Sequence, residues 1–296
     1  MRKKEFQYQL LFNTVMAAFS LLILLPLVLL FVSSFTDNNE IILKGYSFFP
    51  KQLSLSAYAY IWKERAQIFS AYFVTIAVTA VGTSIGLIIS IMYAYALSKP
   101  YFFGKRFFSL YILFTMLFNG GLVPTYIMYT RYLHMKNTPF ALVIPALLMN
   151  AFNVLLIRSY FINNVPASLV EAAKIDGATE WQTLLKVVIP VSKPIIVTIG
   201  LFIGLAYWND WQNGLYYITK PELYSVQQIL NNMLRNIEYL TKNSSAAQKS
   251  TTLAGTLPAS TVRMAIAVVG MLPILVIYPF IQKYFVKGIA LGAVKE

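Results

Sequence analysis

Long apolar segments recur along this chain of 296 residues and limit its possible folds more than any other feature. A helix needs roughly 20 residues to cross the hydrocarbon core of a bilayer, and six segments are long and apolar enough. They lie at about 12–34, 70–98, 108–130, 139–161, 191–215 and 264–284. The sequence therefore predicts an all-α polytopic membrane protein with six transmembrane helices. Residues 12–296 form its membrane domain, and residues 1–11 form a short segment before it.

Composition supports a membrane protein and argues against nucleic acid as a partner. Hydrophobic residues make up 58% of the chain and charged residues only 12%, which is typical of polytopic membrane proteins. A nucleic-acid-binding protein concentrates basic residues on one face, whereas the net charge of +13 here is spread between apolar segments. Anionic lipid and membrane topology explain this charge better. The absence of cysteine excludes disulfides and cysteine metal sites.

The basic residues also predict an orientation. The first apolar segment follows Arg2, Lys3 and Lys4, and it is too long for a secretory signal, so we expect a retained anchor. Placing the N-terminus inside gathers the basic residues of the shorter loops on the cytoplasmic side, as the positive-inside rule requires. We therefore expect a multi-pass protein of the cell membrane with both chain ends in the cytoplasm.

A polar island at 163–190 separates two of the apolar segments and is longer than a simple connection needs. A helix can start at Pro166, because proline in a first turn gives up no needed hydrogen bond. Gly177 readily adopts the left-handed backbone that ends a helix. Thr179 and Gln182 fit a capping box, which starts a second helix. The island is therefore predicted to be a helical hairpin, although a hairpin lying on the bilayer surface would show the same spacing.

The island resembles the EAA loop of permeases from binding-protein-dependent ABC importers. In that family two cytoplasmic helices form the coupling element, which sits in a groove of the ATPase subunit. By this resemblance the coupling residues are Glu171, Ala172, Ala173, Asp176, Gly177 and Pro190. The glutamate would pair with a basic residue of the ATPase, and the small alanines would let the helix sit deep in the groove. Acid–base catalysis by the two carboxylates is the alternative, and an exposed position disfavours it.

Other motifs extend the resemblance over nearly the whole chain. They lie at 118–126, 208–211, 278–288 and 292–295. These motifs are similar to motifs of maltose-type carbohydrate permeases. The motif at 118–126 is similar to the Gram-positive oligosaccharide branch of that family. The cargo implied by this resemblance is a carbohydrate, in particular an oligosaccharide, carried into a Gram-positive bacterium.

Energy must come from a partner chain. No G-x-x-x-x-G-K-[ST] pattern occurs, so we expect no cofactor on this chain, and ATP and Mg to be bound by partner ATPase subunits. No internal repeat is evident that would let one chain form both halves of a transporter. The resemblance implies a second permease subunit, two cytoplasmic ATPase subunits, an extracytoplasmic solute-binding lipoprotein, membrane lipid and a carbohydrate substrate.

Trp208, Asn209, Asp210 and Trp211 are candidates for the translocation path. A carboxylate at the centre of a bilayer costs roughly 2.5 to 3.5 kcal/mol, so Asp210 should face water or protein. The indole rings could stack on sugar faces while the polar pair binds hydroxyl groups. An interfacial aromatic belt beside a solvated acid is the alternative.

Glycine pairs predict a break and a close contact. Gly120 and Gly121 should interrupt the third apolar segment, and Gly82 and Gly86 permit close helix packing or are merely tolerated. The polar stretch from about 216 to 261 is expected to be an outer loop that meets the solute-binding protein, or else a flexible tether.

Two rival classes remain to be weighed. Within the transporter class, ABC import of a peptide or a polyol phosphate is the closer alternative. An ion-coupled carrier or a membrane-embedded enzyme should instead show several acids or clustered histidines within the apolar segments, and the sequence shows neither.

Overall fold

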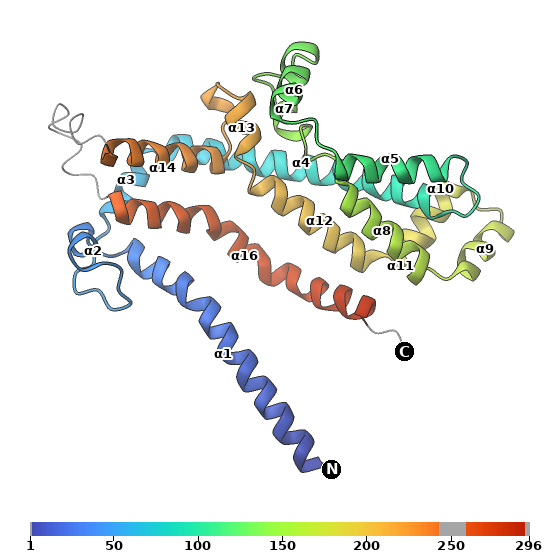
Figure 1. Ribbon diagram of the computed structural model, residues 1–296, viewed down its shortest axis with the longest axis horizontal. Helices are drawn as coiled ribbons and strands as arrows, with labels where there is room; N and C mark the ends of the chain where they lie inside the picture. Colours follow the sequence, from blue (N-terminus) through green and yellow to red (C-terminus); the bar gives the residue numbers. More distant parts are fainter. Residues whose placement is uncertain (1, 243–258, 294–296) are drawn as a thin grey trace. The chain divides into compact units, whose positions relative to one another are not determined.

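The computed structural model describes residues 2–242 and 259–293, and the fold is helical throughout this part of the chain (Figure 1). One isolated antiparallel bridge, between Thr36 and Leu53, is the β-structure found there. The chain divides into two compact units, residues 1–66 with 230–274 and residues 67–229 with 275–296. The predicted helical class is confirmed.

The first unit contains the N-terminal helix, two short helices and parts of two later ones. They are α1 (Arg2–Ser34), α2 (Asn38–Lys44), α3 (Ser56–Lys63), and portions of α14 (Val226–Lys242) and α16 (Ala259–Ala293). The second unit contains the helices around the polar island. They are α4 (Arg65–Ser98), α5 (Lys105–Leu117), α6 (Leu122–Ile127), the π-helix η1 (Met128–Tyr132), α7 (Phe140–Val143), α8 (Ala151–Asn164), α9 (Ala167–Ile175), α10 (Glu180–Thr183), the π-helix η2 (Leu184–Val188), α11 (Ile189–Val191), α12 (Lys193–Trp208), α13 (Gln212–Tyr217) and the 3₁₀-helix η3 (Pro221–Leu223).

Within the part of the chain that the structure describes, three helices are long and apolar enough to cross a membrane by themselves. These stretches are Tyr8–Ser34, Arg65–Ser98 and Ser260–Pro279, and they correspond to the first, second and sixth predicted spans. In the most apolar part of the first stretch no side chain is buried within the protein, whereas Ser33 and Ser34 at its end are buried. Such an apolar surface fits contact with lipid tails better than contact with water.

The third predicted span is a bent pair of helices. Lys105–Leu117 and Leu122–Tyr132 meet at 111°. The bend falls at Gly120 and Gly121, where the break was predicted, and Gly121 has φ +84°. Glycine accepts this backbone conformation without strain.

The fourth predicted span, 139–161, is wrong as one continuous helix. After α7 the chain leaves helical geometry near Pro145 and Ala146, whose φ is +62°, and α8 starts again at Ala151. The freed carbonyls are not left unpaired. The Tyr207 hydroxyl donates to the Val143 oxygen at 2.7 Å, and Asn213 Nδ2 donates to the Pro145 oxygen at 3.0 Å. Such pairing is what a helix break inside a membrane protein requires.

The fifth predicted span, 191–215, is also wrong as one continuous helix. α12 ends at Trp208, and α13 begins at Gln212 after a three-residue break. Asp210 Oδ1 accepts the backbone N–H groups of Gln212 and Asn213 at 3.1 and 3.2 Å, so it pairs two of the free N–H groups in the first turn of the new helix. Before α12, the stretch Glu180–Val191 meets it at 86°.

Close packing at glycine positions holds the second unit together. A Cβ atom at Gly82 would overlap the ring of Tyr207, and one at Gly86 would lie 2.8 Å from the Leu148 oxygen. The two glycines therefore permit a close approach to α4, rather than being merely tolerated there. Ile157 of α8 and Ile199 of α12 are fully buried in the same core.

A buried glutamate organises the segment after α1. Glu40 accepts the backbone N–H groups of Lys51 at 3.2 Å and Gln52 at 2.8 Å, and its carboxylate lies 3.5 Å from Lys44 Nζ. The side chain is 9% exposed. The backbone donors of Gln52 and then Lys51 lower the pKa of Glu40 below its ordinary value.

The stretch predicted to be one polar outer loop, 216–261, is partly helical. The structure forms α14 over Val226–Lys242, whose Ile229, Leu230 and Ile237 are buried. Buried apolar residues at this spacing lie on one face of an amphipathic helix. Residues 243–258, which include most of the rest of that prediction, lie outside the described residues.

Candidate functional site

The polar island folds into two helices joined by a tight turn. α9 starts after Pro166, whose extended backbone has φ −60° and ψ 129°. The N–H of Ala178 donates to the Ala173 oxygen at 2.9 Å, and the N–H of Gly177 donates to the Lys174 oxygen at 3.1 Å. These two bonds form a Schellman motif, which requires a left-handed residue. Gly177 supplies it, with φ +77°.

The second helix begins with the predicted capping box. Thr179 Oγ1 accepts the N–H of Gln182 at 3.2 Å, and Gln182 Oε1 accepts the N–H of Thr179 at 2.9 Å. The helix continues past Pro190, through η2 and α11, then ends at Val191 and meets α12 at 86°. Proline has no N–H to donate to the preceding turn, and the π-helical turn at Leu184–Val188 accommodates this loss.

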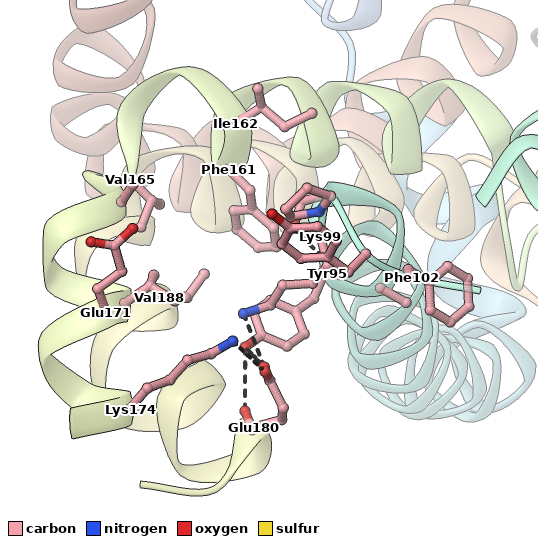
Figure 2. Close-up of a pocket in the computed structure, with 16 residues that line it drawn as sticks. Tyr95, Lys99, Phe102, Phe161, Ile162, Val165, Glu171, Lys174, Glu180 and Val188 are labelled. Carbon is pink, nitrogen blue, oxygen red and sulfur yellow. Dashed lines mark hydrogen bonds and ion pairs between the residues drawn. The ribbon is translucent and has the colours of Figure 1, made fainter. Parts of the chain in front are cut away.

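The predicted coupling residues lie on the surface of this hairpin. Glu171, Ala172, Asp176 and Gly177 are exposed, and Ala173 is half-buried. In Figure 2 the carboxylate of Glu171 points away from the cluster of dashed contacts.

A polar cluster that the sequence analysis did not identify connects the hairpin to the end of α4. Glu180 Oε2 accepts a hydrogen bond from the Tyr95 hydroxyl at 2.6 Å and lies 2.9 Å from Lys99 Nζ. Its other oxygen, Oε1, lies 3.2 Å from Lys174 Nζ of α9 (Figure 2). The Tyr95 hydrogen bond, followed by Lys99, lowers the pKa of Glu180 to about 2. No residue spacing could reveal this cluster, because Tyr95 and Glu180 are 85 positions apart.

The end of α4 is fixed to its neighbours as well. Arg158 Nε of α8 donates to the Leu97 oxygen at 3.2 Å, and Lys105 Nζ donates to the Lys99 oxygen at 3.1 Å. The Lys99 ammonium also lies 4.4 Å from the centre of the Tyr95 ring. Cations at this position complement the negative end of the helix dipole.

A cavity of about 710 Å³ lies beside the cluster, between the hairpin and the helices α4 and α8. Phe161, Val165, Val170 and Val188 give it largely apolar walls, and Glu180 lies on its lining (Figure 2). The hairpin is therefore not packed continuously against the helices beside it.

The four path candidates lie at the other end of α12. Trp208 is buried, with its ring 6.4 Å from that of Tyr72, whereas Asn209 is exposed. Asp210 and Trp211 are half-buried. A helix rises about 1.5 Å per residue, so the length of α12 separates this group from the hairpin.

Comparison with known proteins places the chain in a family. Residues 96–291 match the family described as the binding-protein-dependent transport system inner membrane component. The polygalacturonan/rhamnogalacturonan transport system permease protein YtcP of Bacillus subtilis (strain 168) is 34% identical over 277 residues, with 94% of each chain covered. Protein LplC of the same organism is 33% identical, with 92% of this chain and 89% of that protein covered.

A solved structure of a transporter is also similar to this chain. One chain of a crystal structure of a bacterial ABC transporter, involved in the import of the acidic polysaccharide alginate, matches with a TM-score of 0.77 and 32% identity. The match covers 94% of this chain and 96% of that one. This protein therefore belongs to the family of inner membrane components of binding-protein-dependent transport systems.

Proposed function

We propose that this chain is a permease subunit of an ABC importer and forms half of the translocation path for a carbohydrate. The observation that carries the proposal is its similarity, over 94% of both chains, to an oligosaccharide-type permease, YtcP. A second permease subunit forms the other half of the path. In this proposal an extracytoplasmic solute-binding lipoprotein delivers the cargo, and its support is that the family description names a binding protein.

The α9–α10 hairpin is the proposed contact with a cytoplasmic ATPase. Its support is the exposure of Glu171, Asp176 and Gly177 on a rigid turn, in a chain whose sequence has no P-loop pattern. Two ATPase subunits hold ATP and Mg in this proposal, and both ends of the chain lie in the cytoplasm. The organism is a Gram-positive bacterium, in keeping with the Bacillus relatives.

An acidic oligosaccharide is the proposed cargo. Two of the similar proteins are named for polygalacturonan/rhamnogalacturonan and for the acidic polysaccharide alginate. The proposed contacts on this chain are Asn209, Asp210 and Trp211, which are at least partly accessible. Trp208 is buried against Tyr72, so its proposed role is to hold this turn in place.

Reconstitution of the complete importer in proteoliposomes tests the proposal. We expect ATP-dependent uptake of uronate-containing oligosaccharides, stimulated by the solute-binding protein. Neutral oligosaccharides, a peptide and a polyol phosphate serve as competing cargoes, and uptake of either of the last two instead would contradict the carbohydrate proposal. Uptake without any ATPase subunit would contradict the importer itself. Asp210→Ala is expected to raise the apparent KM for the sugar, and normal kinetics would remove Asp210 from the path.

A further inference from the structure

The contacts of Glu180 join parts of the second unit that are remote in the sequence. Its carboxylate binds Tyr95 and Lys99 at the end of α4 and Lys174 at the end of α9. We infer that Tyr95 and Glu180 form a positioning link, which carries movement of the α9–α10 hairpin into α4. This inference rests on the proposed function, because it needs an ATPase that moves the hairpin.

The geometry of the link suits the transfer of force. A hydrogen bond of 2.6 Å from the Tyr95 hydroxyl to a carboxylate is short and charge-assisted, and such bonds are about twice as strong as neutral ones. The Lys99 ammonium, 2.9 Å from the same oxygen, adds a second contact from the residue that directly follows α4. It also lies 4.4 Å from the centre of the Tyr95 ring, so the two partners of Glu180 are held side by side.

A cavity beside the link makes it important for passing movement from the hairpin to α4. The cavity between the hairpin and the helices α4 and α8 leaves apolar packing there incomplete. Movement of the hairpin could therefore close or widen the cavity without moving α4, unless a direct contact spans it. Glu180 makes such a contact. Because the end of α4 is also bonded to Arg158 of α8, a displacement passed to α4 would reach α8.

A purely structural ion pair would behave differently. The side chain of Glu180 is 57% exposed, and exposed ion pairs contribute little to stability. Loss of the link should therefore leave thermal stability nearly unchanged while it lowers the amount of cargo moved per ATP. If the link served only to stabilise the fold, its loss would change thermal stability and the amount of cargo moved per ATP together, or would change neither.

Transport and ATP hydrolysis measured together in proteoliposomes test the inference. Tyr95→Phe removes the hydroxyl and keeps the ring, and Glu180→Gln removes the charge. The matched control is Tyr93→Phe on the same helix, because the Tyr93 hydroxyl donates to the Phe108 oxygen, 3.1 Å away on α5, and not to the hairpin.

We expect both link variants to bind the ATPase subunits normally and to lower the number of sugars moved per ATP about threefold or more, while the control keeps the wild-type ratio. An unchanged ratio in the link variants would overturn the inference, and so would an equal fall in Tyr93→Phe. Neither result would affect the proposed function. A wild-type importer that transports without the ATPase would overturn both.

Discussion

Two glutamates, Glu40 and Glu180, use the same carboxylate chemistry for different purposes. Glu40 is 9% exposed and accepts backbone N–H groups from residues 11 and 12 positions away, so it holds one local segment in shape. Glu180 is 57% exposed and binds the side chain of Tyr95, 85 positions away. In this protein the buried carboxylate therefore holds a local segment, whereas the exposed one joins distant helices.

The strongest test of this contrast uses two glycines, one near each glutamate. Gly45 follows α2 with φ +78°, and Gly177 follows α9 with φ +77°, and a Cβ atom would meet nothing within 4 Å at either position. Valine at either site should therefore cost only backbone strain, about 1–3 kcal/mol. We expect both Gly45→Val and Gly177→Val to lower thermal stability, and Gly45→Val to lower it more, because the ψ of Gly45 is −171°, in a region that is essentially restricted to glycine.

Only Gly177→Val is expected to lower the number of sugars moved per ATP, since only that turn belongs to the hairpin. Thermal unfolding and coupled uptake assays on the purified importer would measure the two effects. Equal losses of coupling in both variants would show that the two segments do not differ in function.

A double-mutant cycle sharpens the comparison at Glu180. Tyr95→Phe removes the donor, and Glu180→Gln removes the charge, of the same hydrogen bond, so their small effects on stability should be non-additive by about 0.5 kcal/mol. Tyr93→Phe combined with Glu180→Gln should be additive within about 0.3 kcal/mol. Fully additive effects in the first pair would mean that the hydrogen bond has no energetic role.

Hydrogen exchange tests the local role of Glu40. Glu40→Ala removes the acceptor of the Lys51 and Gln52 amides, so these amides should exchange roughly fivefold faster. Glu64→Ala is the control, because it removes an exposed acid from the same unit. Unchanged exchange at both amides would show that Glu40 does not hold the segment.

Local signals in the sequence were sufficient for part of the hairpin. The turn at Gly177 and the capping box of Thr179 and Gln182 involve residues within a few positions of one another, and both are present. Pro190 lies one residue before the end of this helix at Val191, and a π-helical turn precedes it.

Features that depend on distant partners could not be predicted. The left-handed backbone of Ala146 carries no sequence signal, and the break there is paired by Tyr207 and Asn213 from later helices. The partners of Glu180 are likewise distant. α14 is amphipathic and polar overall, so its sequence lacks the long apolar run by which a membrane span is predicted.

The pH dependence of stability should give the smallest effect. The pKa of Glu40 is lowered by folding, so its carboxylate stabilises the folded protein above the ordinary value of 4.5, and this stability is lost as the pH falls below it. The difference in thermal stability between wild type and Glu40→Gln should be constant near neutral pH and shrink toward about pH 3. A difference that grows on acidification would contradict this assignment.

The central claim is that the α9–α10 hairpin meets a cytoplasmic ATPase, and single cysteines test it most directly. The chain contains no cysteine, and Ile175 at the end of α9 is 86% exposed, while Leu43 of α2 is 81% exposed. The measurement is labelling of Ile175→Cys and Leu43→Cys by a membrane-impermeant maleimide in inside-out and right-side-out vesicles. The account predicts that Ile175→Cys is labelled only in inside-out vesicles and is protected by the bound ATPase, and that Leu43→Cys is labelled only in right-side-out vesicles. Labelling of Ile175→Cys from the outer face would contradict the account.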